Sequence, residues 1–391
     1  MTIYLKPHKE ESVLRFHPWV FSGAVARIDG NPSEGEVVSV VASDGTALGA
    51  GHYQIGSIAV RLLTFSPNEK IDAAFFRRRI ESAYNMRKAL GLIRKDNDTY
   101  RLVHGEGDML PGLIIDVYGD TAVMQAHSVG MHLIRRELAE IVKDVVVEVS
   151  NVYYKSEGTL PYKAPLEERD DGYLIGNEGQ SVGCENGLKF NIDWLRGQKT
   201  GFFVDQRDNR SLLERYSRDR NVLNMFCYTG GFSVYALRGG ALSVHSVDSS
   251  AKAIELTERN VNLNFGECER HKAFAEDAFR FLDNMQQAYD LIILDPPAFA
   301  KHRGAIRNAL QGYRRLNQKA LEKIAPHSIL FTFSCSQVVD KDMFRLAVFS
   351  AAAAAKRQVR ILHQLTQPAD HPINIYHPEG EYLKGLVLYV E

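Results

Sequence analysis

The second half of the chain alternates regularly between short apolar runs and longer segments with helical periodicity. Apolar runs that recur between helices are typical of parallel strands, because crossover helices cover both faces of such a sheet. We therefore expect an α/β fold with a mostly parallel sheet, whose carboxyl edge binds ligands. The predicted strands are 221–227, 242–248, 270–275, 289–294, 328–334 and 382–390, and the predicted helices are 231–238, 251–263, 278–287, 309–324 and 342–357.

The first half of the chain shows two other patterns. Residues 1–72 contain β-rich runs, such as 36–41 and 58–65, separated by glycine, proline and asparagine, which predicts a small all-β barrel or sandwich. A mixed region follows, with helices predicted at 73–90 and 131–143 and strands at 100–103, 113–117, 121–127 and 145–154. The predicted domains are therefore an all-β domain at 1–72, a small α+β domain at 73–185 and an α/β domain at 186–391.

Composition limits the class of protein. No apolar run reaches the about 18 residues of a membrane helix, and the N-terminus lacks the apolar core of a signal peptide, so we expect a cytoplasmic protein with no membrane partner. The cysteines Cys184, Cys227, Cys268 and Cys335 form no Cys-x-x-Cys pair, so we expect free thiols and no metal site. A free thiol is by default a small buried apolar group, and a chemical role for one requires a specific argument.

Charge is balanced overall but not locally. The net charge of −1 does not by itself indicate a nucleic-acid partner. Residues 75–95, however, contain seven cations against the single acid Glu81. This segment is either a solvated helix face or a surface that contacts phosphates. Its cations are Arg77, Arg78, Arg79, Arg87, Lys88, Arg94 and Lys95.

The first three strands of the α/β region end in residues suited to a nucleoside ligand. The first leads into a glycine pair, which allows a tight turn and close approach of a ligand to the backbone. The second ends in Asp248, 17 residues after Gly231, where a carboxylate can accept hydrogen bonds from ribose hydroxyls. The third is followed by Asp277, which either accepts from an adenine amine or caps the next helix.

The fourth and fifth strands end in different chemistry. Asp295-Pro296-Pro297 follows the fourth strand, and its two prolines remove two amide donors and keep the chain extended. Cys335 follows the fifth strand, so its thiol is expected at the ligand-binding edge of the sheet. Cys335 is therefore the cysteine for which the buried default is weakest, whereas we expect Cys227 to be structural.

These segments resemble, in chain order, the motifs of class I methyltransferases. The set is most similar to the bacterial large-subunit (23S) ribosomal RNA cytosine-5 methyltransferases that carry an N-terminal PUA domain, and the similarity covers the whole chain. It implies a PUA-like barrel, a small α+β domain and a Rossmann-like domain with a seven-stranded sheet. The segments that carry it are 17–23, 201–207, 228–233, 247–250, 276–279, 295–299, 334–336, 371–372 and 382–385.

The resemblance also implies a cofactor, partners and binding residues. The cofactor is S-adenosylmethionine (SAM), the partner is large-subunit ribosomal RNA, and a homodimer is left open. Cofactor contacts are implied for Asn224, Phe226, Tyr228, Thr229, Gly230, Asp248, Ser249, Asp277, Ala278 and Asp295, with Thr200 or Phe202 covering the cofactor. Arg207 and Lys301 are either RNA phosphate contacts or solvated surface cations, and Arg77, Arg78 and Arg79 belong to the basic stretch that would dock the surrounding RNA.

The implied reaction is covalent catalysis. Carbon 5 of cytosine is a poor nucleophile, and addition of the Cys335 thiolate to carbon 6 would activate it. A nearby Lys or Arg is expected to favour the thiolate. Asp295 would hold the edge of the base by a proton at ring nitrogen 3 or by a bond to the amine. Pro297 stands where some cytosine methyltransferases carry a second cysteine, so a two-cysteine scheme is not indicated.

Three alternatives remain open from the sequence. A uracil-5 methyltransferase shares the single-cysteine logic, but its cysteine usually lies in Ser-Cys-Asn-Pro, whereas here Ser336 and Gln337 follow Cys335. A guanine or exocyclic-amine methyltransferase needs no nucleophilic cysteine. A non-catalytic RNA-binding assembly factor could keep the fold without the reaction.

Overall fold

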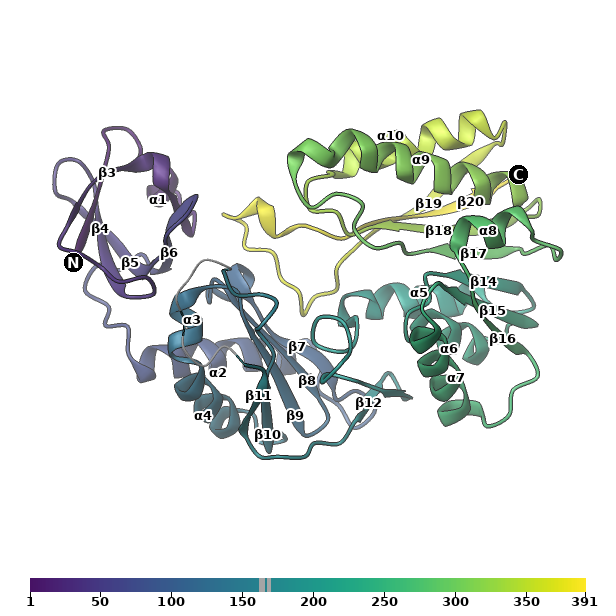
Figure 1. The fold of residues 1–391 in the computed structure, drawn as a ribbon, viewed down its shortest axis with the longest axis horizontal. Coiled ribbons are helices and arrows are strands. Elements are labelled where there is room, and N and C mark those ends of the chain that lie inside the picture. The colour runs from purple at the N-terminus through teal and green to yellow at the C-terminus, as the bar shows by residue number, and fades with distance from the viewer. Residues whose placement is uncertain (162–165, 167–169) are drawn as a thin grey trace. The chain divides into compact units, whose positions relative to one another are not determined.

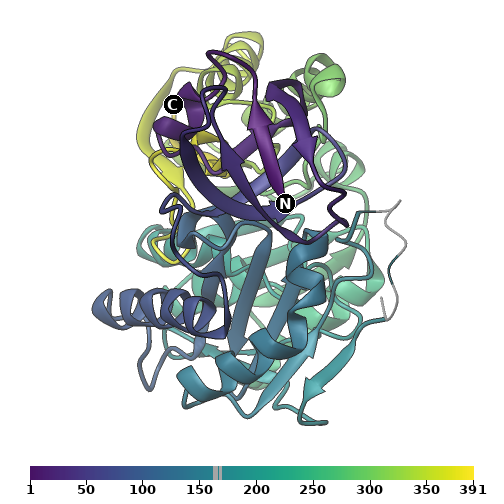
Figure 2. The same cartoon turned by 90° about the vertical axis from the view of Figure 1, so that its left-hand side faces the viewer.

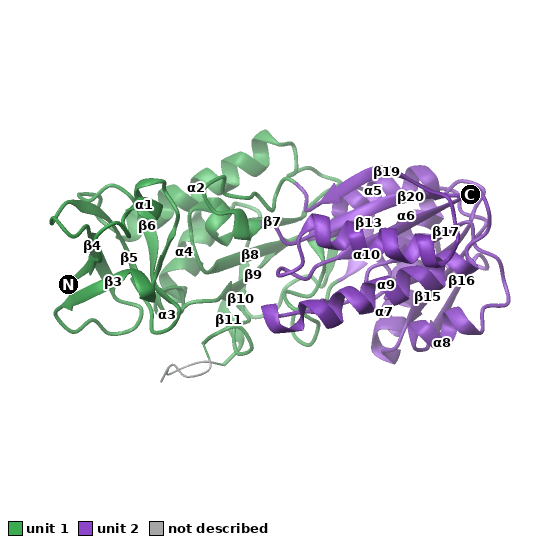
Figure 3. Cartoon of the chain, turned by 90° about the horizontal axis from the view of Figure 1, so that it is seen from above, with its two compact units in different colours: residues 1–184, 192–204, 369–380 green, residues 185–191, 205–368, 381–391 purple. Residues whose placement is uncertain are grey.

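A computed structural model describes residues 1–161, 166 and 170–391 of the chain. The backbone divides into two compact units, shown in two colours in Figure 3, and each is described by itself. The predicted division into three domains stays a prediction, because the first two predicted domains fall in one unit. Unit 1 comprises residues 1–184, 192–204 and 369–380, and unit 2 comprises residues 185–191, 205–368 and 381–391.

The N-terminal part of unit 1 is a six-stranded sheet in the order β2-β6-β5-β4-β1-β3, visible in purple in Figures 1 and 2. Alternate residues of its strands point into an apolar core that includes Ile3, Val40 and Val60. Gly51 allows two strands to approach closely, because a Cβ there would lie 2.0 Å from the carbonyl oxygen of Arg61. The strands are β1 Thr2–Leu5, β2 Trp19–Phe21, β3 Val25–Asp29, β4 Val37–Val41, β5 Ala47–Tyr53 and β6 Ile58–Thr64, with α1 Glu11–Leu14 after β1.

A second, five-stranded sheet of unit 1 has the order β11-β10-β9-β8-β7. Its core includes apolar side chains of the helices α2 Ala73–Ala89 and α4 Arg135–Val145, and Asp72 caps α2 by accepting from the amide of Phe75. The short helix α3 Val129–Leu133 precedes α4. The strands are β7 Thr99–His104, β8 Leu113–Tyr118, β9 Thr121–Ala126, β10 Asn151–Tyr154 and β11 Gly172–Ile175.

Two predictions in this region were wrong in detail. The helix predicted at 131–143 is the pair α3 and α4, which meet at Ile134. The strand predicted at 145–154 occupies only residues 151–154, because Val146 and Val149 belong to a loop whose side chains pack into the core. A run of buried valines does not by itself distinguish a strand from a loop that packs on the core.

Unit 2 contains the predicted α/β fold. Its seven-stranded sheet has the order β16-β15-β14-β17-β18-β20-β19, and all neighbours are parallel except that β20 runs antiparallel to β18 and β19. The strands are β14 Asn221–Met225, β15 Ser243–Asp248, β16 His271–Ala275, β17 Leu291–Leu294, β18 Ser328–Ser334, β19 Val359–Thr366 and β20 Lys384–Val390. The fold class predicted from the sequence is therefore confirmed.

Helices cover both faces of this sheet, as Figure 1 shows. Apolar side chains of α8, α9 and α10 share one core with the strands, while α6 packs between α5 and α7 on the other face. The helices are α5 Arg207–Tyr216, α6 Gly231–Arg238, α7 Ala251–Phe265, α8 Ala278–Asp283, α9 Ile306–Lys323 and α10 Lys341–Ala354. A two-stranded sheet of β12 Val182–Glu185 and β13 Leu188–Asn191 lies where the chain passes from unit 1 to unit 2.

The strand order places a switch point at the centre of the sheet. From β14 the chain proceeds to β15 and β16 on one side, and then returns to β17 and β18 on the other. The connections that leave β14 and β17 therefore diverge at their carboxyl ends and leave a crevice for a ligand. The strand ends singled out in the sequence meet at this edge.

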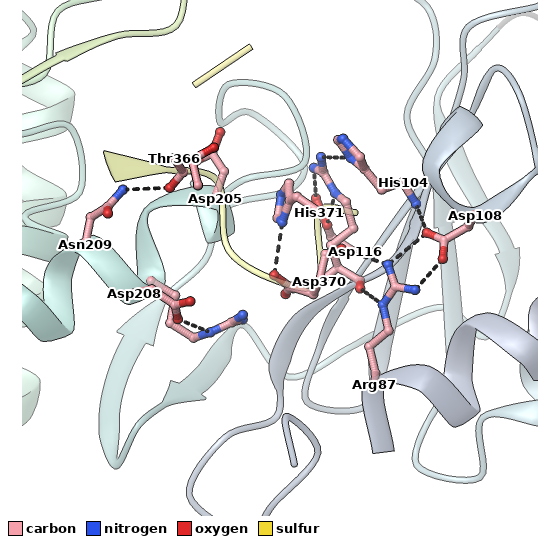
Figure 4. Close-up of polar contacts among 12 residues, drawn as sticks. Arg87, His104, Asp108, Asp116, Asp205, Asp208, Asn209, Thr366, Asp370 and His371 are labelled. Carbon is pink, nitrogen blue, oxygen red and sulfur yellow. Dashed lines mark hydrogen bonds and ion pairs between the residues drawn. The ribbon is translucent and has the colours of Figure 1, made fainter. Parts of the chain in front are cut away.

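A buried ion pair holds the C-terminal segment of unit 1 on its second sheet (Figure 4). Arg87 of α2 is fully buried and binds both carboxylate oxygens of Asp108, at 2.5 and 2.8 Å. The same guanidinium donates to the carbonyl oxygens of Arg101 and Asp370, at 2.8 and 2.7 Å. The interpretation of Arg87 as one of the surface cations of 75–95 was therefore wrong: it neutralises a buried acid.

We expect Arg87→Met to destabilise unit 1 by about 3–5 kcal/mol, because it removes one partner of a buried pair and leaves the Asp108 carboxylate uncompensated. Urea unfolding monitored by circular dichroism measures this change. Arg77→Met is the matched control, because its pair with Asp144 is exposed and should contribute about 1 kcal/mol or less. Equal effects of the two substitutions would contradict the assignment.

Candidate active site

The loop after β14 has an unusual backbone. Phe226, Tyr228 and Gly230 all have positive φ angles, of 59°, 48° and 77°. A Cβ at Gly230 would lie 2.6 Å from the Cγ2 of Thr257, so glycine is needed there for space as well as for conformation. The Thr257 hydroxyl donates to the carbonyl oxygen of Tyr228 at 2.9 Å. Helix α7 thus holds the loop in a conformation that a free chain would rarely adopt.

Asn224 lies beneath this loop at the end of β14 and is buried. Its Nδ2 donates to the Ser233 hydroxyl at 2.9 Å, and that hydroxyl shares a 2.7 Å hydrogen bond with Ser246. Among the described residues, the Asn224 Oδ1 has no hydrogen-bond partner. A buried acceptor without a partner is costly, so a ligand N–H at this position would relieve a real deficit.

The two acids after β15 and β16 are both bound to backbone amides. Asp248 accepts from the amide of Tyr228 at 3.1 Å and from that of Ser250 at 2.9 Å, so it fixes the glycine-loop backbone to the end of β15. Asp277 caps α8, since one of its oxygens accepts from the amides of Phe279 and Arg280, each at 3.0 Å. Capping, one of the two interpretations of Asp277, is therefore present, and an adenine contact through its second oxygen stays a prediction.

The neighbours of these acids differ in exposure. Ser249 is exposed, whereas Thr229 and Ala278 are buried. The cofactor contacts predicted for all three residues stay predictions.

Cys335 lies half-buried where β18 ends. Its Sγ is 3.9 Å from the carbonyl oxygen of Pro296, in the segment that follows β17. The next residue, Ser336, accepts from the amide of Ala300 at 3.1 Å and shares a 2.8 Å hydrogen bond with the Tyr313 hydroxyl. The structure therefore brings the cysteine and the Asp-Pro-Pro segment together, and helix α9 contributes a side chain that keeps them so.

Lys384, at the start of β20, is the functional candidate that the sequence interpretation missed. It is 4% exposed, and its Nζ donates to the carbonyl oxygens of Ser336 and Tyr382, at 2.6 and 2.7 Å. Burial lowers the pKa of Lys384 to about 8, and the neighbouring Cys335 thiolate opposes that effect. The sequence feature that could have indicated Lys384 is a single lysine at the start of an apolar strand, within segment 382–385, which carries part of the family resemblance.

Asp295 is positioned by the segment that enters α5. Its Oδ2 accepts from the Nε2 of Gln206 at 3.1 Å, and the Oε1 of Gln206 accepts from Asn209 at 2.7 Å. Gln206 is buried, so this amide is held and presents its donor to the carboxylate. Gln206 belongs to a recognised segment, but no local pattern pairs it with Asp295.

Two predicted cofactor contacts belong to unit 1. Thr200 is buried, and its hydroxyl donates to Asp116 at 2.6 Å and bonds the Tyr118 hydroxyl at 2.9 Å. Phe202 is also buried, and its carbonyl oxygen accepts from Tyr118 at 3.3 Å. Unit 2 taken alone does not contain either residue, so their contact with the cofactor stays a prediction.

The predicted RNA-binding cations fall into three groups. Arg207 is 2% exposed and lies next to Asp208, so its burial argues against the surface phosphate contact predicted for it. Lys301 is exposed. Arg77, Arg78 and Arg79 are each engaged within unit 1, with Asp144, with Glu69 and with the Phe75 ring respectively. All of these contacts, including that of Arg207, stay predictions.

The absence of a metal site also stays a prediction. In unit 1, one ligand-type atom each of His17, His377 and Glu379 lies within 4.8 Å of the others. The Nε2 atom of His17 lies 3.5 Å, and that of His377 lies 3.7 Å, from the Glu379 carboxylate. Ordinary histidine–carboxylate pairs have the same distances. The expectation of no metal site was based on the spacing of the cysteines, which does not bear on a cluster of histidines and a glutamate.

Cys227 differs sharply from Cys335. It is buried beside the Thr257 hydroxyl, and burial raises the pKa of its thiol to about 12. The expectation that Cys227 is a structural residue agrees with this environment. Cys184 and Cys268 are half-buried.

We expect iodoacetamide at pH 8 to alkylate Cys335 and to leave Cys227 unmodified. With a pKa of about 12, roughly 10⁻⁴ of the Cys227 thiol is ionised at that pH, and the thiolate is the reactive form. Peptide mass spectrometry after a timed quench gives the labelling of each cysteine, and unfolding in urea should expose Cys227. Rapid labelling of Cys227 in the folded protein would refute the assignment.

Comparisons with known proteins agree with this geometry. Residues 174–377 match a family model described as S-adenosylmethionine-dependent methyltransferase, and residues 3–65 match a PUA-like domain. Ribosomal RNA large subunit methyltransferase I of Tolumonas auensis is 41% identical over 394 residues, covering 99% of this chain and 98% of that protein. The protein of the same name from Aeromonas salmonicida is 39% identical over 392 residues, covering 99% and 98%.

Solved structures show the same fold. SMU.776, described as a methyltransferase complexed with SAH, superimposes with a TM-score of 0.86 and covers 100% of both chains at 22% identity. None of the described helices has both the length and the apolar character needed to cross a membrane. From its family match and its full-length relatives, the chain belongs to the ribosomal RNA large subunit methyltransferase I family of SAM-dependent methyltransferases.

Proposed function

We propose that this protein methylates carbon 5 of a cytosine in large-subunit ribosomal RNA, with Cys335 as the nucleophile. The observation that carries the proposal is the position of Cys335 at the carboxyl edge of the sheet, near Pro296 and in the electrostatic field of Lys384. The names of the full-length relatives support ribosomal RNA of the large subunit as the substrate.

The reaction requires activation of a weak nucleophile. The Cys335 thiolate adds to carbon 6 of the base, an S–C bond forms, and the electron pair of the carbon 5–carbon 6 double bond becomes available at carbon 5. SAM, when bound, would supply the methyl group that carbon 5 accepts, and the sulfonium sulfur would keep the electron pair of the broken S–CH3 bond and leave as a thioether. Loss of the carbon 5 proton then restores the double bond and expels the thiolate, so Cys335 is regenerated.

Lys384 is proposed to favour the thiolate of Cys335. The Lys384 side chain is almost entirely excluded from water. A charge interacts more strongly with its neighbours in the protein interior than it does in water. An opposite charge nearby favours the ionised form of a thiol. Lys384 acts through Cys335 and does not touch the base in this scheme, so we describe it as a positioning residue.

Asp295 is proposed to hold the edge of the target base. The hydrogen bond from Gln206 orients the carboxylate, which would meet the exocyclic amine or a proton at ring nitrogen 3 of the base. Either contact would stabilise the charge that develops on the ring when sulfur adds to carbon 6.

The residues that line the glycine loop fit the cofactor. The backbone at 226–230 can approach a ligand closely, and the unpartnered Asn224 Oδ1 offers it an acceptor. We propose that Asp248 and Ser249 contact the ribose, and that Asp277 and Ala278 contact the adenine. Asp295 would lie beside the reacting end of the cofactor.

The substrate must present an unstacked base. Carbon 6 is covered by its neighbours in a helix, so the target nucleotide is proposed to be single-stranded or flipped. Lys301 and the arginines Arg77, Arg78 and Arg79, which are at least partly exposed, are proposed to contact phosphates, which makes affinity dependent on salt. A homodimer stays a prediction.

We expect Cys335→Ala to abolish formation of 5-methylcytosine while leaving SAM affinity unchanged within about twofold. RNA containing 5-fluorocytidine should trap the wild-type protein covalently, because fluorine at carbon 5 cannot leave as a proton, and should not trap the variant. Bisulfite sequencing measures 5-methylcytosine, calorimetry measures SAM affinity, and denaturing gels detect the covalent complex. Cys268→Ala is the matched control, since it removes another half-buried thiol.

The same assays separate the alternatives. Trapping by 5-fluorouridine RNA alone would identify a uracil-5 methyltransferase. Retained methylation by Cys335→Ala would identify an exocyclic-amine or guanine methyltransferase and end the covalent scheme. SAM binding without any methylation of ribosomal RNA would favour a non-catalytic factor.

We expect Lys384→Met to lower kcat at pH 7 by about 10- to 100-fold with little change in the KM for RNA. Lys384 is charged below its pKa of about 8 and supports the thiolate there, and this support is lost as the pH rises through 8. The variant should therefore regain activity relative to wild type as the pH increases and its thiol ionises unaided. Lys384→Arg, which keeps the charge, should retain more activity; a pH-independent ratio would contradict the electrostatic role.

A further inference from the structure

A groove lies between α9 and α10 in unit 2, and none of the predicted cofactor contacts lines it. Its volume is about 540 Å³, which is within the range of small-molecule sites. One wall is a stripe from η4 Arg303–Ala305 and the first half of α9, and the other is a stripe of α10 from Met343 to Ser350. No proposed catalytic residue lines it.

One wall of the groove carries unneutralised positive charge. Arg303, Arg307 and Arg314 are all exposed and line the same stripe, at helical spacings of four and seven residues. Within the described part of the chain, none of the three forms an ion pair or hydrogen bond, and no carboxylate lines the groove. Asp342, at the start of α10, pairs instead with Arg345 at 3.4 Å. Three free guanidinium groups on one rim favour a polyanion.

The floor and the opposite wall are apolar. Leu310 of α9 faces Met343 and Leu346 of α10, and the last two side chains are 37% and 61% exposed. Apolar side chains left open to water beside cations suit a ligand with a flat apolar part and an attached anion. A nucleotide has both, because its base has a π-face and its phosphate accepts bidentate hydrogen bonds from arginine.

The position of the groove favours RNA over other polyanions. Helix α9 follows the segment that leaves β17, and α10 follows the segment that leaves β18, so both helices start at the edge that carries Asp295 and Cys335. Tyr313 of α9 packs against Phe344 of α10 with ring centroids 5.4 Å apart, and its hydroxyl bonds Ser336 at 2.8 Å. Tyr313 thereby ties the two helices that form the groove to the cysteine loop.

We propose that this groove binds a segment of the substrate RNA that flanks the target nucleotide, with a base on the apolar floor and phosphates on Arg303, Arg307 and Arg314. The identity of the ligand as substrate RNA rests on the proposed function. Because the groove lies beside the catalytic edge, it would fix which neighbours of the target base can be accommodated.

The test compares two triple variants that each remove three positive charges. The groove variant carries Arg303→Gln, Arg307→Gln and Arg314→Gln, and the control carries Arg218→Gln, Lys252→Gln and Arg259→Gln, which are exposed cations outside the groove. Fluorescence anisotropy measures binding of unmodified large-subunit ribosomal RNA fragments, transcribed in vitro, at several salt concentrations. Thermal unfolding and calorimetry with SAM confirm that both variants are folded and bind the cofactor.

We expect the groove variant to bind RNA at least tenfold more weakly at low salt. The slope of log affinity against log salt concentration should also become shallower, by roughly 0.7 for each single-stranded phosphate that the variant no longer neutralises. The control should stay close to wild type. Leu346→Glu, which places an acid on the exposed apolar wall opposite the arginines, should weaken binding in the same direction. Equal RNA affinity of the groove variant and the control would overturn the proposal, and would leave an acidic protein segment as the occupant to seek.

The outcome is separable from that of the proposed function. Weaker RNA binding by the groove variant supports the groove even if wild-type protein methylates a base other than cytosine. Conversely, trapping of wild type by 5-fluorocytidine RNA together with unchanged RNA affinity of the groove variant would keep the proposed reaction and reject the groove.

Discussion

The antiparallel pairing of β18 with β20 is the constraint on which the candidate active site depends. Ser334, the last residue of β18, is the register partner of Lys384, the first residue of β20. Since the two strands run in opposite directions, this register brings the Lys384 ammonium group near Cys335 from a position almost fifty residues later. A slip of one residue would turn Lys384 to the opposite face of the sheet.

The parallel part of the sheet imposes a second condition. Because β14, β15, β16, β17 and β18 all point the same way, their carboxyl ends share one edge, although they are spread over more than a hundred residues. The switch between β14 and β17 then opens a crevice at that edge. The strained loop at 226–230 is tolerable only because Thr257 and Asp248 hold its backbone from two neighbouring elements.

The difference between the local pattern of the strands and the register that pairs them explains what could be predicted from the sequence. The buried parallel strands could be predicted, because short continuous apolar runs such as 291–294 are typical of strands covered on both faces. The strand ends that carry polar groups could be predicted with them. Strand β19 was missed, since its residues mix polar and apolar types without the continuous burial of the central strands. Lys384 and Gln206 were missed for a different reason: their partners, Ser336 and Asp295, are set by tertiary register, which local spacing does not report.

The positions of the cations show more clearly that local sequence does not report tertiary partners. The segment 75–95 is conspicuous because its cations are consecutive, yet Arg87 is buried against Asp108, and Arg77 and Arg78 are paired with acids of unit 1. The cations of the α9 groove are separated by four and seven residues and form no conspicuous run, although no described acid neutralises them. Whether a cation is available to a phosphate depends on what faces it in three dimensions, so a chain with a net charge of −1 can still present a surface suited to RNA.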